Sequence, residues 1–204
     1  VRNGAVKHSG KLPYYRALVG AINANKQAGR GGACTTYYNA FDPQVETIMR
    51  LKNQRSTDSK KIRGLDYAFS QNKLFDCHSE PELFEAMYGK DPLVFERMYE
   101  EYVSNHVKVK KFINARSLLL QAFDEAFETG RHYLFQIDEA NRHNPFKESV
   151  YSSNLCLEYI SPTKGYDDMR DLYSTEDHGR GEIGLCSLAA INVANIKNDA
   201  EYKK

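Results

Sequence analysis

The first quarter of the chain alternates between segments with helical periodicity and a short run with the composition of a strand. Residues 12–26, LPYYRALVGAINANK, predict a short helix with a proline near its start. Residues 34–41, CTTYYNAF, have the β-branched and aromatic content of a strand. Residues 42–53, DPQVETIMRLKN, predict a second helix with Asp42 as N-cap and Pro43 at the first helical position.

The next stretch is first polar and then amphipathic. Residues 55–63, RSTDSKKIR, predict an exposed loop because charge runs are usually solvated. Residues 80–89 and 91–106 each begin with an acidic residue followed by proline, which is a helix-start signal. An amphipathic pattern from Lys108 to Thr129 predicts a long helix, with Gly130 placed to cap its end.

Three short segments in the last third of the chain are candidates for extended structure. They are residues 131–137, 153–160 and 181–192, separated by polar loops rich in Asp, Asn and Gly. Residues 198–204 form a polar, helix-like tail. Helices that alternate with short strands predict an α/β layer or barrel architecture, and 204 residues suffice for one domain with a sizeable core.

The charge balance and the lack of long apolar runs argue against nucleic-acid and membrane partners. Lys and Arg number 28 and Asp and Glu number 27, so the net charge of +1 gives no general reason to expect nucleic acid or an anionic membrane as a partner. No apolar run approaches the roughly 20 residues needed to span a bilayer, and the first ten residues lack the apolar core of a secretory signal. We therefore expect a cytoplasmic protein.

The cysteines favour neither a disulfide scaffold nor a metal site. Their spacing is wide and irregular, and no CxxC pair points to structural zinc. No metal site is expected. In a reducing compartment such thiols are core residues or take part in chemistry; they are Cys34, Cys77, Cys156 and Cys186.

One thiol stands in an unusual row of polar residues. In the segment NLCLEYI, an extended backbone would place Asn154, Cys156 and Glu158 on one face and the apolar residues on the other. A cysteine between leucines is often a small core residue. However, burying an amide and a carboxylate beside it costs several kcal/mol unless both find partners, so the row also fits a substrate pocket. Cys186, in the segment 181–192, could face the same cavity as a reductant, whereas no cysteine-protease signature surrounds either thiol.

A glycine-rich segment offers a second candidate for chemistry. Residues 28–34, AGRGGAC, are neither a P-loop nor a GxGxxG motif, and on their own they predict a flexible turn. The planar guanidinium of Arg30 suits a phosphate or the edge of a base.

Several segments, taken together and in order, resemble the large catalytic subunit of class I ribonucleotide reductase of the bacterial or bacteriophage type. They read RGGACTTYY, VETIMRLKN, LDYAFSQNKLF, ETGRHYLFQIDEANRHNPF, and SNLCLE followed by GEIGLCSLAAIN. The resemblance implies a ten-stranded α/β barrel with the reactive cysteine on an inner finger loop. It also implies that residues 1–204 are the central portion of this barrel domain, incomplete at both ends.

The resemblance implies a role for each residue of the row. Cys156 matches the cysteine that becomes a thiyl radical and abstracts the ribose 3′-hydrogen. Glu158 matches the carboxylate that takes the 3′-hydroxyl proton, and Asn154 matches the amide that hydrogen-bonds the ribose hydroxyls. Cys186 matches one member of the redox pair that supplies reducing equivalents as the 2′-hydroxyl leaves as water, and its partner thiol is expected to precede Val1. Cys34 and Cys77 match no thiol of the family.

The resemblance also implies effectors and partners. Residues 23–33 match the loop that links the effector-specificity site to the substrate base, with Gln27 and Arg30 as the communicating side chains and Gly31 and Gly32 as the flexible part. The expected function is reduction of ribonucleoside diphosphates to deoxyribonucleotides. No cofactor is expected on this chain, because a metal-containing small subunit supplies the radical. ATP and deoxynucleoside triphosphates are expected as effectors, thioredoxin or glutaredoxin as reductant, and a homodimer as the assembly.

Two alternatives remain open at this point. One is a cobalamin-dependent relative, which would need adenosylcobalamin in place of a second protein. The other is a non-catalytic barrel fragment that serves as an assembly piece or binds nucleotides, because the segments that flank this chain in the family are missing from it.

Overall fold

The computed structural model describes residues 10–25, 29, 31–72, 77–78, 94, 97–98, 100–101, 112–168, 170–174 and 181–198. The chain falls into two compact units, Val1–Thr163 and Lys164–Lys204.

The first unit is built on a three-stranded parallel sheet. Its strands are β1 (Thr35–Asn39), β2 (Asp66–Gln71) and β5 (His132–Gln136), in the order β1-β2-β5. The register places Tyr37 opposite Ala68, and Ala68 opposite Tyr133. Parallel strands linked through helices confirm the predicted α/β class.

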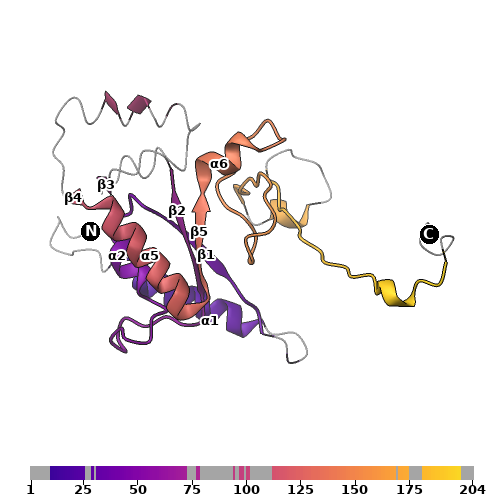
Figure 1. Cartoon of the computed structure of the whole chain (residues 1–204), viewed down its shortest axis with the longest axis horizontal. Helices are drawn as coiled ribbons and strands as arrows, with labels where there is room; N and C mark the ends of the chain where they lie inside the picture. The colour runs from indigo at the N-terminus through magenta and orange to yellow at the C-terminus, as the bar shows by residue number, and fades with distance from the viewer. Residues whose placement is uncertain are drawn as a thin grey trace. The chain divides into compact units, whose positions relative to one another are not determined.

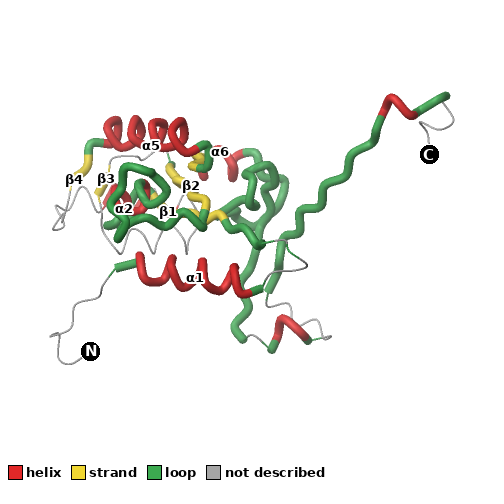
Figure 2. The backbone as a smooth tube through the Cα atoms, turned by 90° about the horizontal axis from the view of Figure 1, so that it is seen from below, coloured by secondary structure: helices red, strands yellow, loops and turns green. Residues whose placement is uncertain are grey.

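Helices cover one side of this sheet. They are α1 (Leu12–Ala24), α2 (Val45–Met49) and α5 (Ala115–Thr129), and side chains from all three pack into one core. In Figure 1, α2 and α5 lie to one side of the strands, and α1 runs across their lower end. Figure 2 shows the same helices along the sheet, with α1 and α5 at its two ends. A fourth helix, α6 (Ile137–Arg142), follows β5 directly. The coil after α6 lies on the opposite side of the strands from α2 and α5 (Figure 1).

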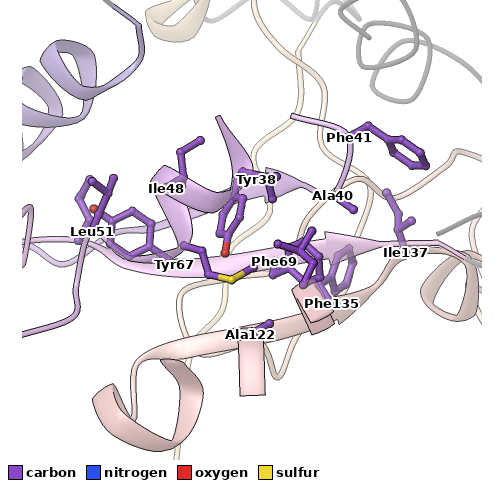
Figure 3. Close-up of a cluster of buried hydrophobic side chains, with 14 of the residues drawn as sticks. Tyr38, Ala40, Phe41, Ile48, Leu51, Tyr67, Phe69, Ala122, Phe135 and Ile137 are labelled. Atoms are coloured by element: carbon purple, nitrogen blue, oxygen red, sulfur yellow. The ribbon is translucent and has the colours of Figure 1, made fainter. Parts of the chain in front are cut away.

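The core forms between the sheet and the helices. Tyr38, Tyr67 and Phe69 project from the helix side of the strands and are 1% exposed or less. They pack against side chains of α2 and α5, including the fully buried Ile48 and Ala122 (Figure 3). Burial of each large apolar side chain contributes about 1.5–3 kcal/mol, so this layer fixes the positions of the strands.

Several predicted elements are confirmed. The helix expected over residues 12–26 is α1, which has a proline in its first turn. The strands expected in residues 34–41 and 131–137 are β1 and β5. Residues 55–63 lie outside helices and strands and are mostly exposed, as predicted, except for Ile62, which is 4% exposed.

The second helix does not begin at Asp42 as predicted. Helix α2 starts at Val45 with Gln44 as N-cap, and it ends at Met49. The Asp42 carboxylate accepts the backbone N–H of Gln44 at 2.8 Å, and its carbonyl accepts that of Val45 at 2.9 Å. Asp42 therefore organises the turn before the helix.

The long helix predicted from Lys108 begins only at Ala115. Asn114 caps it by accepting the Ser117 N–H at 2.9 Å, and the preceding Phe112–Ile113 form strand β4, which pairs with β3 (Cys77–His78). Gly130 ends the helix in the left-handed region at φ 61°, as predicted. The helices predicted over residues 80–106 lie mostly outside the described residues.

The central strand β2 was not predicted. All six of its residues are buried, so the segment lacks the alternation of apolar and polar residues that marks a half-buried strand. Three of the six, Asp66, Ser70 and Gln71, are polar. What makes the segment a strand is its pairing with β1 and with β5, over five residues each. The local sequence does not reveal this long-range pairing.

The second unit contains little regular structure in its described part. It has an isolated antiparallel bridge between Lys164 and Glu182 and two 3₁₀ turns, Asp171–Tyr173 and Val193–Asn195. The strand expected over residues 181–192 is wrong: within that segment, only the bridge at Glu182 pairs with another part of the chain as a strand would. Residues 199–204 of the expected tail lie outside the described residues.

Candidate functional site

The polar row lies on a loop and not on a strand. Residues 151–160, here called the thiol loop, contain a turn at Leu155 and Cys156 and form no strand. The prediction that a regular strand groups Asn154, Cys156 and Glu158 on one face is therefore wrong. Leu157 has φ 63°, a left-handed conformation that reverses the chain between the thiol and the carboxylate.

The side chain of Asn154 closes this loop. Its Oδ1 accepts the backbone N–H groups of Glu158 at 3.1 Å and Tyr159 at 3.0 Å. Its Nδ2 donates to the Glu158 carboxylate at 2.7 Å. The amide and the carboxylate therefore meet across the turn, and Cys156 lies exposed on the turn between them.

The thiol loop rests on the face of the sheet that carries Thr35 and Tyr37. The Thr35 hydroxyl donates to the carbonyl of Leu155 at 2.7 Å, and the Tyr37 hydroxyl donates to the carbonyl of Asn154 at 2.9 Å. The loop also braces itself, since Ser153 donates its hydroxyl proton to the carbonyl of Tyr159 at 2.5 Å. Partial burial raises the pKa of Tyr37, so its hydroxyl remains a donor at neutral pH.

Charged and phenolic groups surround the same end of the sheet. Asp66, at the start of β2, accepts Lys52 at 2.6 Å and Arg131 at 3.1 Å. The hydrogen bond and charge of Asp66 raise the pKa of Arg131. Partial burial and then Asp66 raise the pKa of Tyr133, with smaller contributions from the nearby Cys156 and Glu158. These side chains were missed because only the register of the strands reveals that they neighbour the loop.

The glycine-rich segment leads directly into β1. Gly31 and Gly32 precede the strand, and a Cβ at Gly32 would lie 2.9 Å from the side chain of Ile22 in α1. Gly32 is therefore required for close packing, whereas a Cβ at Gly31 would meet nothing within 4 Å. The candidate side chains Gln27 and Arg30 lie outside the described residues.

The remaining cysteines differ in their surroundings. Cys34 is half-buried and packs against the core, and burial raises the pKa of its thiol, so its environment is that of a structural residue. Cys186 is exposed in the second unit. The side chain of Cys77 is outside the described part.

Within the described ranges, no three His, Cys, Asp or Glu side chains are placed to hold a metal ion together. None of the helices described here is long and apolar enough to cross a membrane.

The whole chain matches one known protein family. The family model for the ribonucleotide reductase barrel domain matches residues 1–204. The chain belongs to the ribonucleotide reductase family. The match includes both compact units, and so the thiol loop and Cys186 alike.

Relatives of this chain include alpha subunits of ribonucleoside-diphosphate reductases from bacteria and a phage. The ribonucleoside-diphosphate reductase subunit alpha of Buchnera aphidicola subsp. Acyrthosiphon pisum is 34% identical over 221 aligned positions, which cover 100% of this chain and 28% of the relative. Subunit alpha of the Escherichia coli K12 reductase 1 is 34% identical over 82% of the chain and 24% of its own length. Subunit alpha of the Enterobacteria phage T4 reductase is 32% identical over 95% of this chain and 26% of its own length. The chain thus spans less than a third of these relatives.

Proposed function

We propose that this chain is the central portion of the barrel domain of a cytoplasmic ribonucleoside-diphosphate reductase, and that it carries the residues that reduce the ribose. The observation that carries the proposal is the hydrogen bond from Asn154 to Glu158 at 2.7 Å, which closes the turn around Cys156. The names of the relatives support the substrate class. In the complete subunit, the parallel sheet would form part of a ten-stranded barrel, and the thiol loop would be its inner finger.

The arrangement suits radical chemistry on a sugar. Cys156, as a thiyl radical, takes the hydrogen atom from ribose C3′ and becomes a thiol again. Glu158 accepts the 3′-hydroxyl proton, a general-base step that requires it within hydrogen-bond reach of the sugar. Asn154 donates to the ribose hydroxyls. An exposed turn held by its own hydrogen bonds presents all three groups to one ligand.

The net reaction also needs two electrons. Cys186 and a second thiol from another part of the subunit supply them, forming a disulfide as the 2′-hydroxyl leaves as water. A thioredoxin or glutaredoxin then reduces this disulfide by thiol exchange. The hydrogen atom taken from C3′ returns from Cys156 at the end, so the thiyl radical is regenerated. No side chain generates such a radical unaided, and we assign its origin to a metal-containing small subunit.

Regulation is assigned to the glycine-rich segment. Gln27 and Arg30 would pass the identity of an ATP or deoxynucleotide effector to the substrate base, in a subunit that forms a homodimer. Gly31, which has open space around its Cα, supports movement there, whereas Gly32 is packed on α1.

The decisive experiment uses the complete subunit that contains this chain. Purified subunit is incubated with CDP and dithiothreitol, with and without the small subunit and with adenosylcobalamin, and deoxynucleotide is measured. We expect dCDP only when the small subunit is present. Reduction supported by adenosylcobalamin alone would instead assign the chain to the cobalamin-dependent relatives. CDP binding without reduction under any condition would leave a nucleotide-binding module.

A further inference from the structure

We infer that Thr35 and Tyr37 of β1 are positioning residues that hold the backbone of the thiol loop in its reactive shape. The inference rests on the proposed function, because it concerns the same site. Their hydroxyl groups donate hydrogen bonds to the backbone of this loop. Both act through the carbonyl groups of the two residues that precede Cys156.

The geometry supports a two-point clamp. Thr35 and Tyr37 are two residues apart on a strand, so their side chains share one face of the sheet. Thr35 donates to the carbonyl of Leu155 at 2.7 Å, and Tyr37 donates to the carbonyl of Asn154 at 2.9 Å. The two carbonyls are consecutive along the loop. Two bonds to consecutive carbonyls fix both the position and the direction of the backbone that enters the turn.

A third contact fixes the far side of the turn. Leu157 is half-buried and packs against the core, although its φ of 63° is unfavourable for a residue with a side chain. A glycine would relieve the strain but would remove this contact. The turn is therefore held on both sides of Cys156, by hydroxyl groups before it and by an apolar side chain after it.

This clamp matters because hydrogen-atom transfer is sensitive to position. Displacement of a reacting group by about 1 Å can lower a rate by roughly a hundredfold. Ground-state binding of a nucleotide depends on many other contacts. Loosening the clamp should therefore lower kcat while leaving KM almost unchanged.

The same sheet provides matched controls on its opposite face, Thr36 on β1 and Tyr67 on β2. Thr36 donates its hydroxyl proton to the carbonyl of Asp66 at 3.3 Å, and Tyr67 donates to the carbonyl of Ile62 at 2.9 Å. Thr36→Val and Tyr67→Phe therefore remove the same kinds of bond from the same sheet without touching the thiol loop. Thr35→Ser keeps the hydroxyl group and serves as the conservative variant.

The first test measures backbone hydrogen exchange in residues 152–160 of the complete subunit. The N–H groups of Asn154, Leu157, Glu158 and Tyr159 all donate within this loop. Loss of one anchoring bond should speed their exchange by about two- to tenfold in Thr35→Val and in Tyr37→Phe. Exchange in β2 and β5 should stay unchanged, which excludes general misfolding. Thr35→Ser, Thr36→Val and Tyr67→Phe should leave the loop as protected as in the wild type.

The second test measures CDP reduction with the small subunit. Thr35→Val and Tyr37→Phe should lower kcat by about tenfold or more with KM within twofold, and Thr35→Ser should restore most of the rate. Unchanged loop exchange in both variants would overturn the clamp, whatever the enzyme does. Faster loop exchange with an unchanged kcat would also overturn it, because the loop shape would then not control the reaction. Absence of reduction in the wild type would count against the proposed function, while the exchange data would still decide whether the clamp exists.

Discussion

A buried histidine in the core should make the stability of the first unit depend on pH. His132 is 4% exposed, and its Nε2 lies 2.6 Å from the hydroxyl oxygen of Tyr38, which is 1% exposed. Its Nδ1 makes no hydrogen bond of ordinary geometry among the described residues. Burial lowers the pKa of His132 from 6.5 to about 4, and the nearby backbone of Ala122 only partly opposes this shift.

The sign and size of the effect follow from proton binding. Below pH 6.5 the unfolded chain takes up a proton on this histidine, and the folded chain does so only near pH 4. The unfolded state is therefore favoured as the pH falls between these values. The two pKa values give a loss of about 2 kcal/mol between pH 7 and pH 5 and about 3 kcal/mol by pH 4.

The variant Tyr38→Phe/His132→Leu isolates this contribution. It removes the titrating group without leaving a buried hydroxyl unpaired, whereas His132→Leu alone should cost a further 1–3 kcal/mol or so through the orphaned Tyr38. Urea unfolding is followed at pH 7 and pH 5 by far-UV circular dichroism for wild type and double variant. Carboxylates titrate in both proteins, so the difference in pH dependence reports on His132. A double variant that loses as much stability as the wild type would refute the assignment of a neutral buried histidine.

Three further predictions concern the loop, the helix end and the effector segment. Glu158→Gln keeps an acceptor for Asn154 but removes the base, so reduction should slow by about 10²–10⁴-fold. The control Glu139→Gln on α6 should not change the rate. A Glu158→Gln rate equal to that of the wild type would remove Glu158 from base catalysis. Gly130→Ala should lower the free energy of unfolding by about 1 kcal/mol, because Gly130 has a φ of 61°. Gly20→Ala in α1 should raise the free energy of unfolding, because the space around Gly20 is open. An unchanged stability of Gly130→Ala in urea unfolding would contradict this prediction. Arg30→Ala should alter the preference among substrate bases under different effectors, measured with mixed ribonucleotides. Identical effector responses would reduce the segment to a structural turn.

Local sequence patterns predicted the elements whose signals are local. Pro13 and the apolar spacing after it identified α1, and Gly130 identified the end of α5. The patterns failed where long-range pairing decides the structure. Strand β2 is buried on both sides and contains Asp66 and Ser70, so neither alternation nor composition revealed it. The start of α5 moved to Ala115 because Phe112 and Ile113 pair with β3.

Some residues of the candidate site could also be predicted from the sequence, and others could not. The row of Asn154, Cys156 and Glu158 was found from spacing and resemblance, although its geometry is that of a hydrogen-bonded turn and not of a strand. In the sequence, Thr35 and Tyr37 indicate only a strand. Their bonds to the thiol loop cross more than a hundred residues of sequence, so no local pattern can indicate them. Cys186 remains a prediction as a redox partner.

The central claim is that Cys156 performs the radical step, and a cysteine-to-serine pair tests it most directly. Cys156→Ser and Cys34→Ser are compared in the complete subunit with the small subunit, CDP and reductant. The hydroxyl O–H bond of serine is too strong to replace the thiol in hydrogen-atom transfer. The account predicts that Cys156→Ser still binds CDP but forms no dCDP, while Cys34→Ser, altered only at a half-buried packing position, keeps most of the activity. Turnover by Cys156→Ser within a few fold of wild type would contradict the account.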